Sequence, residues 1–223
     1  MTTSTDTGTA TVTGAEMLID RYLPRFDVTL VEHTVVDADI ETTWAALREL
    51  DLMRVHTPLL AAAMFARGVP ARMARWFGRE AGPPQAPPAE LKLTGASAGM
   101  PGWLPLGEVP GREIALGAVG RFWQPDIQWY DVAGMTPDRF AAFEEPGWGR
   151  IAANFTLRPY GRRRTLVSYE ARTATGDPDA ARRFARYWRL VRPFVGHIMR
   201  ATLATLRRDA EPGDRPARPA AGT

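Results

Sequence analysis

The C-terminal part of the chain has the most regular alternation of apolar and charged positions. Asp177 and Pro178 combine an N-cap residue with a proline at the first helical position, which predicts that a helix of about 30 residues begins there. At 100° per residue, this helix has one apolar side and an opposite side rich in arginine. The apolar side contains Phe184, Tyr187, Val191, Val195, Ile198 and Thr202, and the charged side contains Arg182, Arg186, Arg189, Arg200 and Arg207. A broad apolar surface must therefore cover one side of the helix.

Two segments before this helix alternate with a period of two residues. Trp148 to Arg158 and Thr165 to Thr175 are predicted to be half-buried antiparallel strands joined by a turn at Tyr160-Gly161-Arg162. Ile151, Ala153, Phe155 and Leu157 share one face of the first strand, and Val167, Tyr169 and Ala171 share one face of the second. These apolar faces are the obvious surface for the helix to cover.

Further strands are predicted on either side of a Pro-Gly turn and near the N-terminus. Segments 103–108 and 112–123 flank Val109-Pro110-Gly111, where proline followed by glycine suits a type II turn. Phe26 to Val36 is rich in β-branched residues and is predicted to be the first strand. Segment 136–145 fits either a short helix or an edge strand.

Two short helices are predicted after the first strand. Asp37 or Asp39 provides the N-cap of the first, in which Ile40, Trp44 and Leu47 recur at helical spacing. Thr57-Pro58 begins the second. Segment 78–102, rich in proline, glycine and alanine, is expected to be a long flexible loop.

This order of elements predicts an α+β fold, in which helices are segregated from an antiparallel sheet. The sequence contains no βαβ unit and no glycine-rich dinucleotide loop. We expect one domain over residues 15–210, with disordered tails at 1–14 and 211–223, where small and polar residues or prolines replace the apolar period.

Composition narrows the functional classes. The net charge of +3 is modest and the basic residues are almost all arginines spread along the chain, so nucleic-acid binding is not expected. The absence of cysteine excludes disulfides, thiolate metal sites and a thiol nucleophile. With no signal peptide or apolar run of about 18 residues, we expect a cytoplasmic protein without stable membrane insertion.

The chain resembles the START-like superfamily, also called SRPBCC or Bet v 1-like, from about Phe26 to Glu211. The resemblance lies in VEHTVVDADIETTWAAL, the LGEVPGREIALGAVGRFW hairpin, the strands FEEPGWGRIAANFTLRP and TLVSYEART, and the C-terminal DPDAARRFARYWRLVRPFVGHIMRATLATLRRDAE. It looks most like an actinobacterial branch labelled polyketide cyclase or dehydratase-like. The resemblance implies a helix-grip fold, a curved antiparallel sheet around a long C-terminal helix, with a ligand cavity between sheet and helix. It carries no catalytic motif.

Few ionisable residues have the spacing of a reactive site. His33, His56 and His197 are scattered and make no metal-ligand pattern, so neither a metal nor a cofactor is expected. Glu170 and Arg172 form either an outward ion pair or a polar anchor inside the cavity, and the alternation of their strand favours the ion pair. The predicted ligand contacts are Phe155, Tyr169, Trp188, Val191, Val195, Trp123 and Arg172.

Three functions fit this sequence. The first is binding of a small hydrophobic or aromatic molecule, lipid or polyketide-like, between sheet and helix. The second is a polyketide cyclase or dehydratase on the same scaffold, which would need an ionisable pair inside the cavity. The third is a module whose groove grips a partner protein, which would expose an apolar patch when it is alone.

Overall fold

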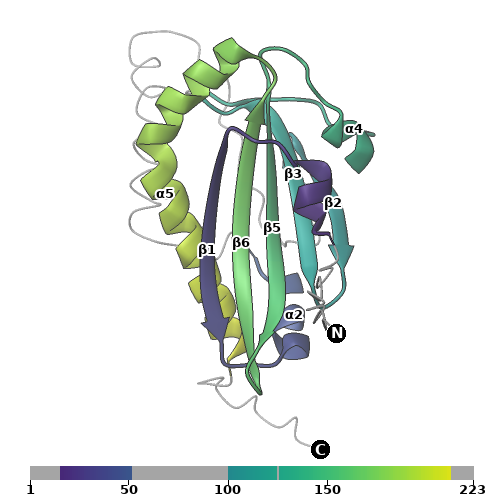
Figure 1. Cartoon of the computed structure of the whole chain (residues 1–223), viewed down its shortest axis with the longest axis vertical. Helices are drawn as coiled ribbons and strands as arrows, with labels where there is room; N and C mark the ends of the chain where they lie inside the picture. Colours follow the sequence, from purple (N-terminus) through teal and green to yellow (C-terminus); the bar gives the residue numbers. More distant parts are fainter. Residues whose placement is uncertain (1–15, 52–99, 125, 212–223) are drawn as a thin grey trace, which may run out of the picture.

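The computed structural model describes residues 16–51, 100–124 and 126–211 (Figure 1). The predicted helix at Thr57-Pro58, most of the predicted 78–102 loop, His56 and both predicted tails lie outside these residues, apart from Glu211. The described elements are α1 (Leu18–Tyr22), β1 (Val28–Val36), α2 (Ile40–Arg48), β2 (Trp103–Val109), β3 (Glu113–Arg121), β4 (Gln128–Trp129), α4 (Pro137–Ala141), β5 (Gly149–Tyr160), β6 (Arg164–Thr175) and α5 (Pro178–Ala210).

The strands form one six-stranded antiparallel sheet. Five of them follow the order β1-β6-β5-β3-β2, and β4 pairs with the end of β3. The first strand of the chain therefore pairs with the last, as Val28 lies opposite Thr173 and Val36 opposite Thr165. The predicted hairpin between β2 and β3 is confirmed, with the Arg112 N–H donating to the Val109 carbonyl at 3.0 Å.

Helix α5 packs against β1 and β6 of the curved sheet and against α2 (Figure 1). The Asp177 side chain caps it by accepting hydrogen bonds from the amides of Asp179 and Ala180, and the helix continues through Pro193. The predicted α+β class, with a long C-terminal helix held against an antiparallel sheet, is confirmed. None of the helices in the described ranges has the length and apolar character to span a membrane.

The two faces of the sheet are covered by different helices. We call the face toward α5 and α2 the inner face; its core includes Ile114, Phe155, Leu157 and Val167. The opposite, outer face carries α1 and α4, with Ile19 and Phe140 fully buried against it. Successive side chains along each strand point to opposite faces of the sheet. One set of alternate residues therefore packs against α5 and α2, and the other set packs against α1 and α4.

The sequence did not clearly predict the two short helices on the outer face. Segment 136–145, left open between helix and strand, contains α4, whose N-cap Thr136 accepts from the Arg139 amide. Helix α1 was not expected, because its five residues are too few to show a helical period. It is held on the sheet by contacts to residues about 95 positions away, described below.

Candidate functional site

An aromatic stack lies at the centre of the inner face. Phe155 of β5 and Tyr169 of β6 are directly opposite in register, with ring centroids 4.1 Å apart and planes tilted by only 24°. Phe155 is buried and Tyr169 half-buried. Ile114 of β3 lies opposite Phe155 on the other side. The central strands therefore present a flat, apolar surface toward α5, as their alternation predicts.

The Tyr169 hydroxyl is the polar group within this surface. Burial alone raises the pKa of Tyr169 to about 12, so the phenol is neutral at physiological pH. Its hydroxyl makes no hydrogen bond within the described part of the chain. A neutral phenol in apolar surroundings can donate one hydrogen bond to a carbonyl or hydroxyl of a bound molecule.

A salt bridge borders the surface where α5 crosses β1. Glu32 lies opposite Tyr169 in register, and its Oε1 is 2.5 Å from Nη1 of Arg200 on α5. Gly196 gives these side chains space, because a Cβ added there would lie 3.2 Å from the Arg200 guanidinium and 3.3 Å from the Glu32 carboxylate. The carboxylate beside Tyr169 is thus already paired with a cation.

The apolar side of α5 is unevenly buried. Met199, Leu203 and Leu206, near its C-terminal end, are at most 2% exposed. At the other end, Phe184 is buried between two tryptophans, 6.3 Å from the Trp123 ring and 5.9 Å from the Trp188 ring. The residues between these ends are only half-buried: Tyr187, Trp188, Val191, Val195 and Ile198. The middle of the apolar side therefore has surface left to cover.

The predicted ligand contacts fall into separate groups. Phe155 and Tyr169 form the stack on the sheet. Trp123 and Trp188 meet around Phe184 at the N-terminal end of α5. Val191 and Val195 lie in the half-buried middle of the same helix. Six of the seven residues thus belong to the inner face, its bordering loop or the side of α5 that faces the sheet.

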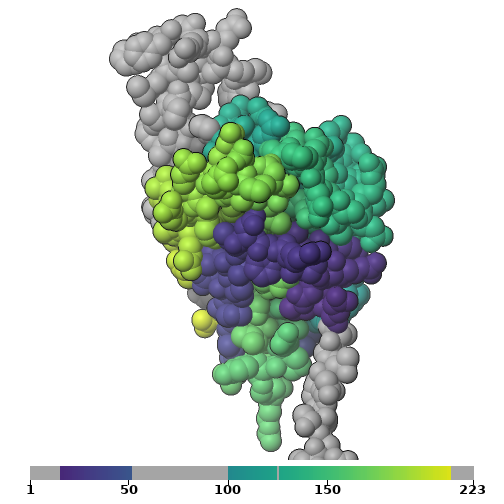
Figure 2. All heavy atoms as spheres, turned by 45° about the horizontal axis from the view of Figure 1, so that its top comes forward, coloured from purple at the N-terminus to yellow at the C-terminus, as the bar shows by residue number. Residues whose placement is uncertain are grey.

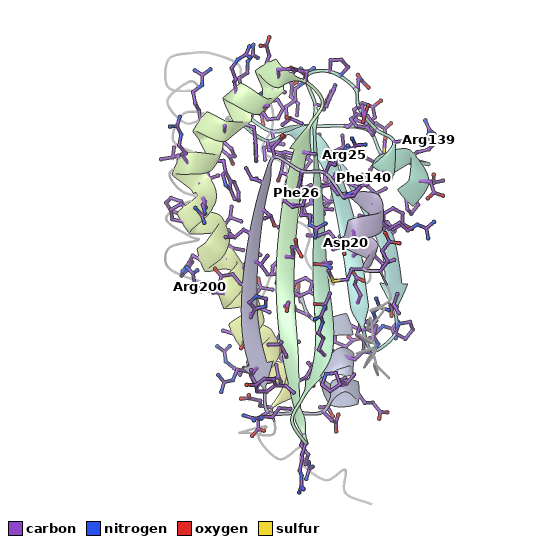
Figure 3. All side chains as sticks on the ribbon, viewed as in Figure 1. Asp20, Arg25, Phe26, Arg139, Phe140 and Arg200 are labelled. Carbon is purple, nitrogen blue, oxygen red and sulfur yellow. The ribbon has the colours of Figure 1, made fainter. Side chains whose placement is uncertain are left out.

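Arg172 is not with them, because it lies on the outer face. Its Nε is 2.6 Å from Oε1 of Glu170, its Nη2 is 2.8 Å from Oδ1 of Asp20, and its guanidinium lies over the Phe26 ring. Figure 3 shows Asp20 on α1, in front of the sheet, whereas Arg200 lies across the sheet on α5. The ion-pair alternative for Glu170 and Arg172 is the observed one, and Arg172 contacts no inner-face residue of the stack.

Sequence reasoning missed a buried carboxylate under α1. Glu113 is fully buried and accepts hydrogen bonds from the Leu18 amide at 2.8 Å, the Ile19 amide at 3.3 Å and Nδ2 of Asn154 at 2.6 Å. Within the described residues, Asn154 Oδ1 is a buried oxygen without a hydrogen-bond partner. The carboxylate satisfies free amides at the start of α1 and so anchors that helix to the sheet.

A pocket of about 360 Å³ opens beside the N-terminus of α5. Its lining residues are Arg121, Trp123, Gln124, Pro146, Gly147, Asp177, Asp179, Ala180 and Arg183. The lining is mixed and both carboxylates are engaged, Asp177 with the Gly147 amide at 2.5 Å and Asp179 with Arg182. Backbone hydrogen bonds from Ala180 and Gly147 lower the pKa of Asp177, which keeps the cap ionised. This pocket shares Trp123 with the predicted contacts but is otherwise separate from the aromatic stack.

His33 contacts a serine hydroxyl and no carboxylate or second histidine in the hydrogen bonds of the described residues. His33 lies on the exposed outer face, where its Nδ1 is 2.8 Å from Oγ of Ser168 on the neighbouring strand. No cluster of three or more potential metal ligands occurs in the ranges that the structure describes. The inner face is therefore the candidate site, and its chemistry is apolar contact with one hydroxyl.

Comparison with known proteins gave only remote structural similarity. No family model and no curated protein matches the chain. A protein from Mesorhizobium loti is 15% identical with a TM-score of 0.36, over 84% of this chain and 99% of that chain. A truncated norcoclaurine synthase from Thalictrum flavum is 8% identical with a TM-score of 0.36, over 84% and 96%. A protein from Arthrobacter aurescens is 12% identical with a TM-score of 0.36, over 82% and 86%. With scores and identities this low, we infer neither fold nor function from these similarities.

Proposed function

We propose that this protein binds a small hydrophobic or aromatic molecule, lipid or polyketide-like, between the inner face of its sheet and the middle of α5. The observation that carries the proposal is the uneven burial of α5, whose apolar side is closed at both ends and half-buried between them. A bound apolar molecule would remove the remaining surface from water, at a gain of about 25 cal/mol per Å².

Tyr169 is the polar contact in this proposal. Its ring extends the flat surface of Phe155, and its hydroxyl is a donor with no protein acceptor among the described residues. Binding sites for apolar molecules commonly use a few such groups to fix orientation. The ligand would therefore carry a hydrogen-bond acceptor close to a flat or flexible apolar body.

Binding is favoured over the cyclase or dehydratase alternative by the state of the ionisable groups. General acid–base catalysis needs groups that exchange protons near the working pH. The phenol of Tyr169 has a pKa of about 12, and Glu32 is paired with Arg200. A phenol that is neutral at physiological pH does not take up a proton there, which supports an anchoring role for Tyr169.

The first test is native mass spectrometry of the freshly purified full chain, followed by organic extraction. A reproducible non-covalent adduct of small-molecule mass supports the proposal and gives the ligand class. If the purified protein carries no bound molecule, binding is measured instead by titration with the neutral fluorescent probe N-phenyl-1-naphthylamine. A bare protein that also fails to bind the probe contradicts the proposal and favours the partner-protein alternative.

Variants locate the bound probe. Val191→Asn should weaken probe binding about 10-fold, because a buried valine side chain contributes about 1.5 kcal/mol. Leu190→Asn is the matched control, since Leu190 immediately precedes Val191 on the helix but is 72% exposed. Equal losses in both variants would show that the probe does not bind at the inner face.

A further inference from the structure

Helix α5 concentrates positive charge. It contains eight arginines and two aspartates, and no acidic residue lies between Asp179 and Asp209. Outside the helix, the chain has 20 basic and 23 acidic residues, so the rest of the molecule has a small excess of negative charge. The net charge of +3 therefore conceals a strong separation of charge, with the positive part on one element.

The outward side of α5 also exposes two large apolar side chains. Leu190 is 72% exposed and Phe194, one helical turn later, is 37% exposed. At 100° per residue, Arg183 and Arg186 lie within about 40° of Leu190 around the helix axis. Both arginines are exposed. We call Arg183, Arg186, Leu190 and Phe194 the basic-apolar face of α5.

Neither arginine of this face is held in a salt bridge among the described residues, although Arg183 lies near enough to Asp177 for its charge to help lower the pKa of that carboxyl. Of the arginines on α5, Arg182 pairs with Asp179, Arg200 with Glu32 and Arg207 with Glu211. In the described ranges, neither Arg183 nor Arg186 forms a salt bridge. Figure 2 shows side chains from the earlier part of α5 at the molecular surface, without α1 or α4 over them.

We propose that the basic-apolar face of α5 docks on an anionic phospholipid bilayer. Arg183 and Arg186 would contact lipid phosphates, while Leu190 and Phe194 enter the boundary between headgroups and acyl chains. Amphipathic helices with basic residues beside exposed leucine and phenylalanine bind membrane interfaces in this way. The proposal does not depend on a ligand at the inner face, because the basic-apolar face is centred about 100° around the helix axis from the apolar side that faces the sheet.

The exposed apolar pair favours a lipid surface over a nucleic acid. Phosphate contacts from arginine would serve either partner. A duplex would leave Leu190 and Phe194 in water, whereas the acyl boundary of a bilayer removes both from water. The helix lies along the membrane plane in this arrangement and does not span the bilayer.

The test is flotation of the full chain with vesicles of phosphatidylglycerol and phosphatidylcholine, compared with vesicles of phosphatidylcholine alone. Binding is expected only with the anionic lipid. The Arg183→Gln/Arg186→Gln double variant should lower the partition coefficient about 30-fold, because each arginine near an anionic surface contributes about 1 kcal/mol. The Leu190→Ser/Phe194→Ser double variant should lower it at least 10-fold. Circular dichroism checks that both variants remain folded.

The matched control is Arg162→Gln/Arg163→Gln, which removes the same charge from the exposed turn between β5 and β6. It should change partitioning less than 3-fold. The proposal is overturned if the wild-type chain does not bind anionic vesicles, or if the control loses as much binding as the α5 variant. It is also overturned if the serine variant binds unchanged, or if single-stranded RNA binds more tightly than the vesicles and competes for the same arginines.

Discussion

At the scale of single residues, the raised pKa of the Tyr169 phenol makes a pH prediction. Burial raises its pKa from 10.0 to about 12 in the folded protein, so the folded state holds the proton more tightly than the unfolded state. The resulting stability is complete below pH 10 and is lost as the pH rises from 10 toward 12. Ultraviolet difference absorbance should show late tyrosinate formation whose amplitude is smaller in Tyr169→Phe.

Assignment of that step needs a comparison, because the pKa of Tyr130 is also raised, chiefly by its hydrogen bond with Glu145. Tyr160→Phe, which removes an exposed tyrosine, should retain the late step. If Tyr169→Phe leaves the amplitude of the late step unchanged, the phenol of Tyr169 does not have the raised pKa that we describe.

Glu113 makes a prediction about stability. Its carboxylate accepts three hydrogen bonds in a fully buried position. Glu113→Gln should lower the free energy of unfolding by about 1.5–3 kcal/mol, because an amide nitrogen then faces one of the donors. Glu144→Gln, at an exposed position, is the control and should change it by less than about 0.5 kcal/mol. Chemical denaturation measures both, and equal values would contradict the anchoring of α1 by Glu113.

For single residues, the sequence predicted the face of the sheet more reliably than it predicted solvent exposure. Alternation along β5 and β6 favours the outward Glu170–Arg172 ion pair, which is the one observed, but Arg172 was also predicted as a ligand contact and lies on the other face from Phe155 and Tyr169. It implied that outward residues meet solvent, yet Asn154 is 1% and Arg172 is 7% exposed. Helix α1 covers this face of the sheet. Its position depends on the hydrogen bond to Glu113, and its five residues are too few to show a helical period in the sequence.

At the scale of elements, a glycine determines how α4 lies on the sheet. A Cβ at Gly117 of β3 would come within 2.9 Å of Cε2 of Phe140 and 3.0 Å of Cδ2 of Leu106. Gly117→Ala should therefore lower the free energy of unfolding by about 1–3 kcal/mol. Phe140→Leu should recover part of that loss when combined with Gly117→Ala, although it is destabilising alone. A double-mutant cycle by thermal or chemical unfolding measures the coupling, and strictly additive losses would show that the two residues do not press on each other.

Elements with local signals could be predicted, and those that depend on distant contacts could not. Proline with glycine marked the β2–β3 turn, and Asp177 with Pro178 marked the start of α5. Helix α4 has a local Thr136-Pro137 start, but its apolar residues are too few to separate helix from strand. For the candidate site, the sheet residues and the apolar side of α5 followed from periodicity. Periodicity could not predict the uneven burial along α5, because that burial depends on how closely each part of the helix packs against the sheet.

At the scale of the whole molecule, charge separation makes a chromatographic prediction. A protein of net charge +3 would bind a cation exchanger weakly if its charges were evenly spread. Because α5 presents its arginines together, we expect retention to a higher salt concentration than evenly spread charges would give. Arg183→Gln/Arg186→Gln should elute clearly earlier than Arg162→Gln/Arg163→Gln, although both have the same net charge. Equal elution of the two variants would mean that the resin detects only total charge.

The pairing of β1 with β6 has a consequence for how the protein is made on the ribosome. β1 leaves the exit tunnel early, but its partner β6 spans Arg164–Thr175, and paired residues of the two strands are 129 to 145 positions apart. During that interval, the growing polypeptide carries a segment rich in β-branched residues whose backbone amides and carbonyls have no partner strand. Nascent chains that stall before β6 emerges are thus candidates for chaperone capture or proteolysis, and the sheet can close only in the last part of synthesis.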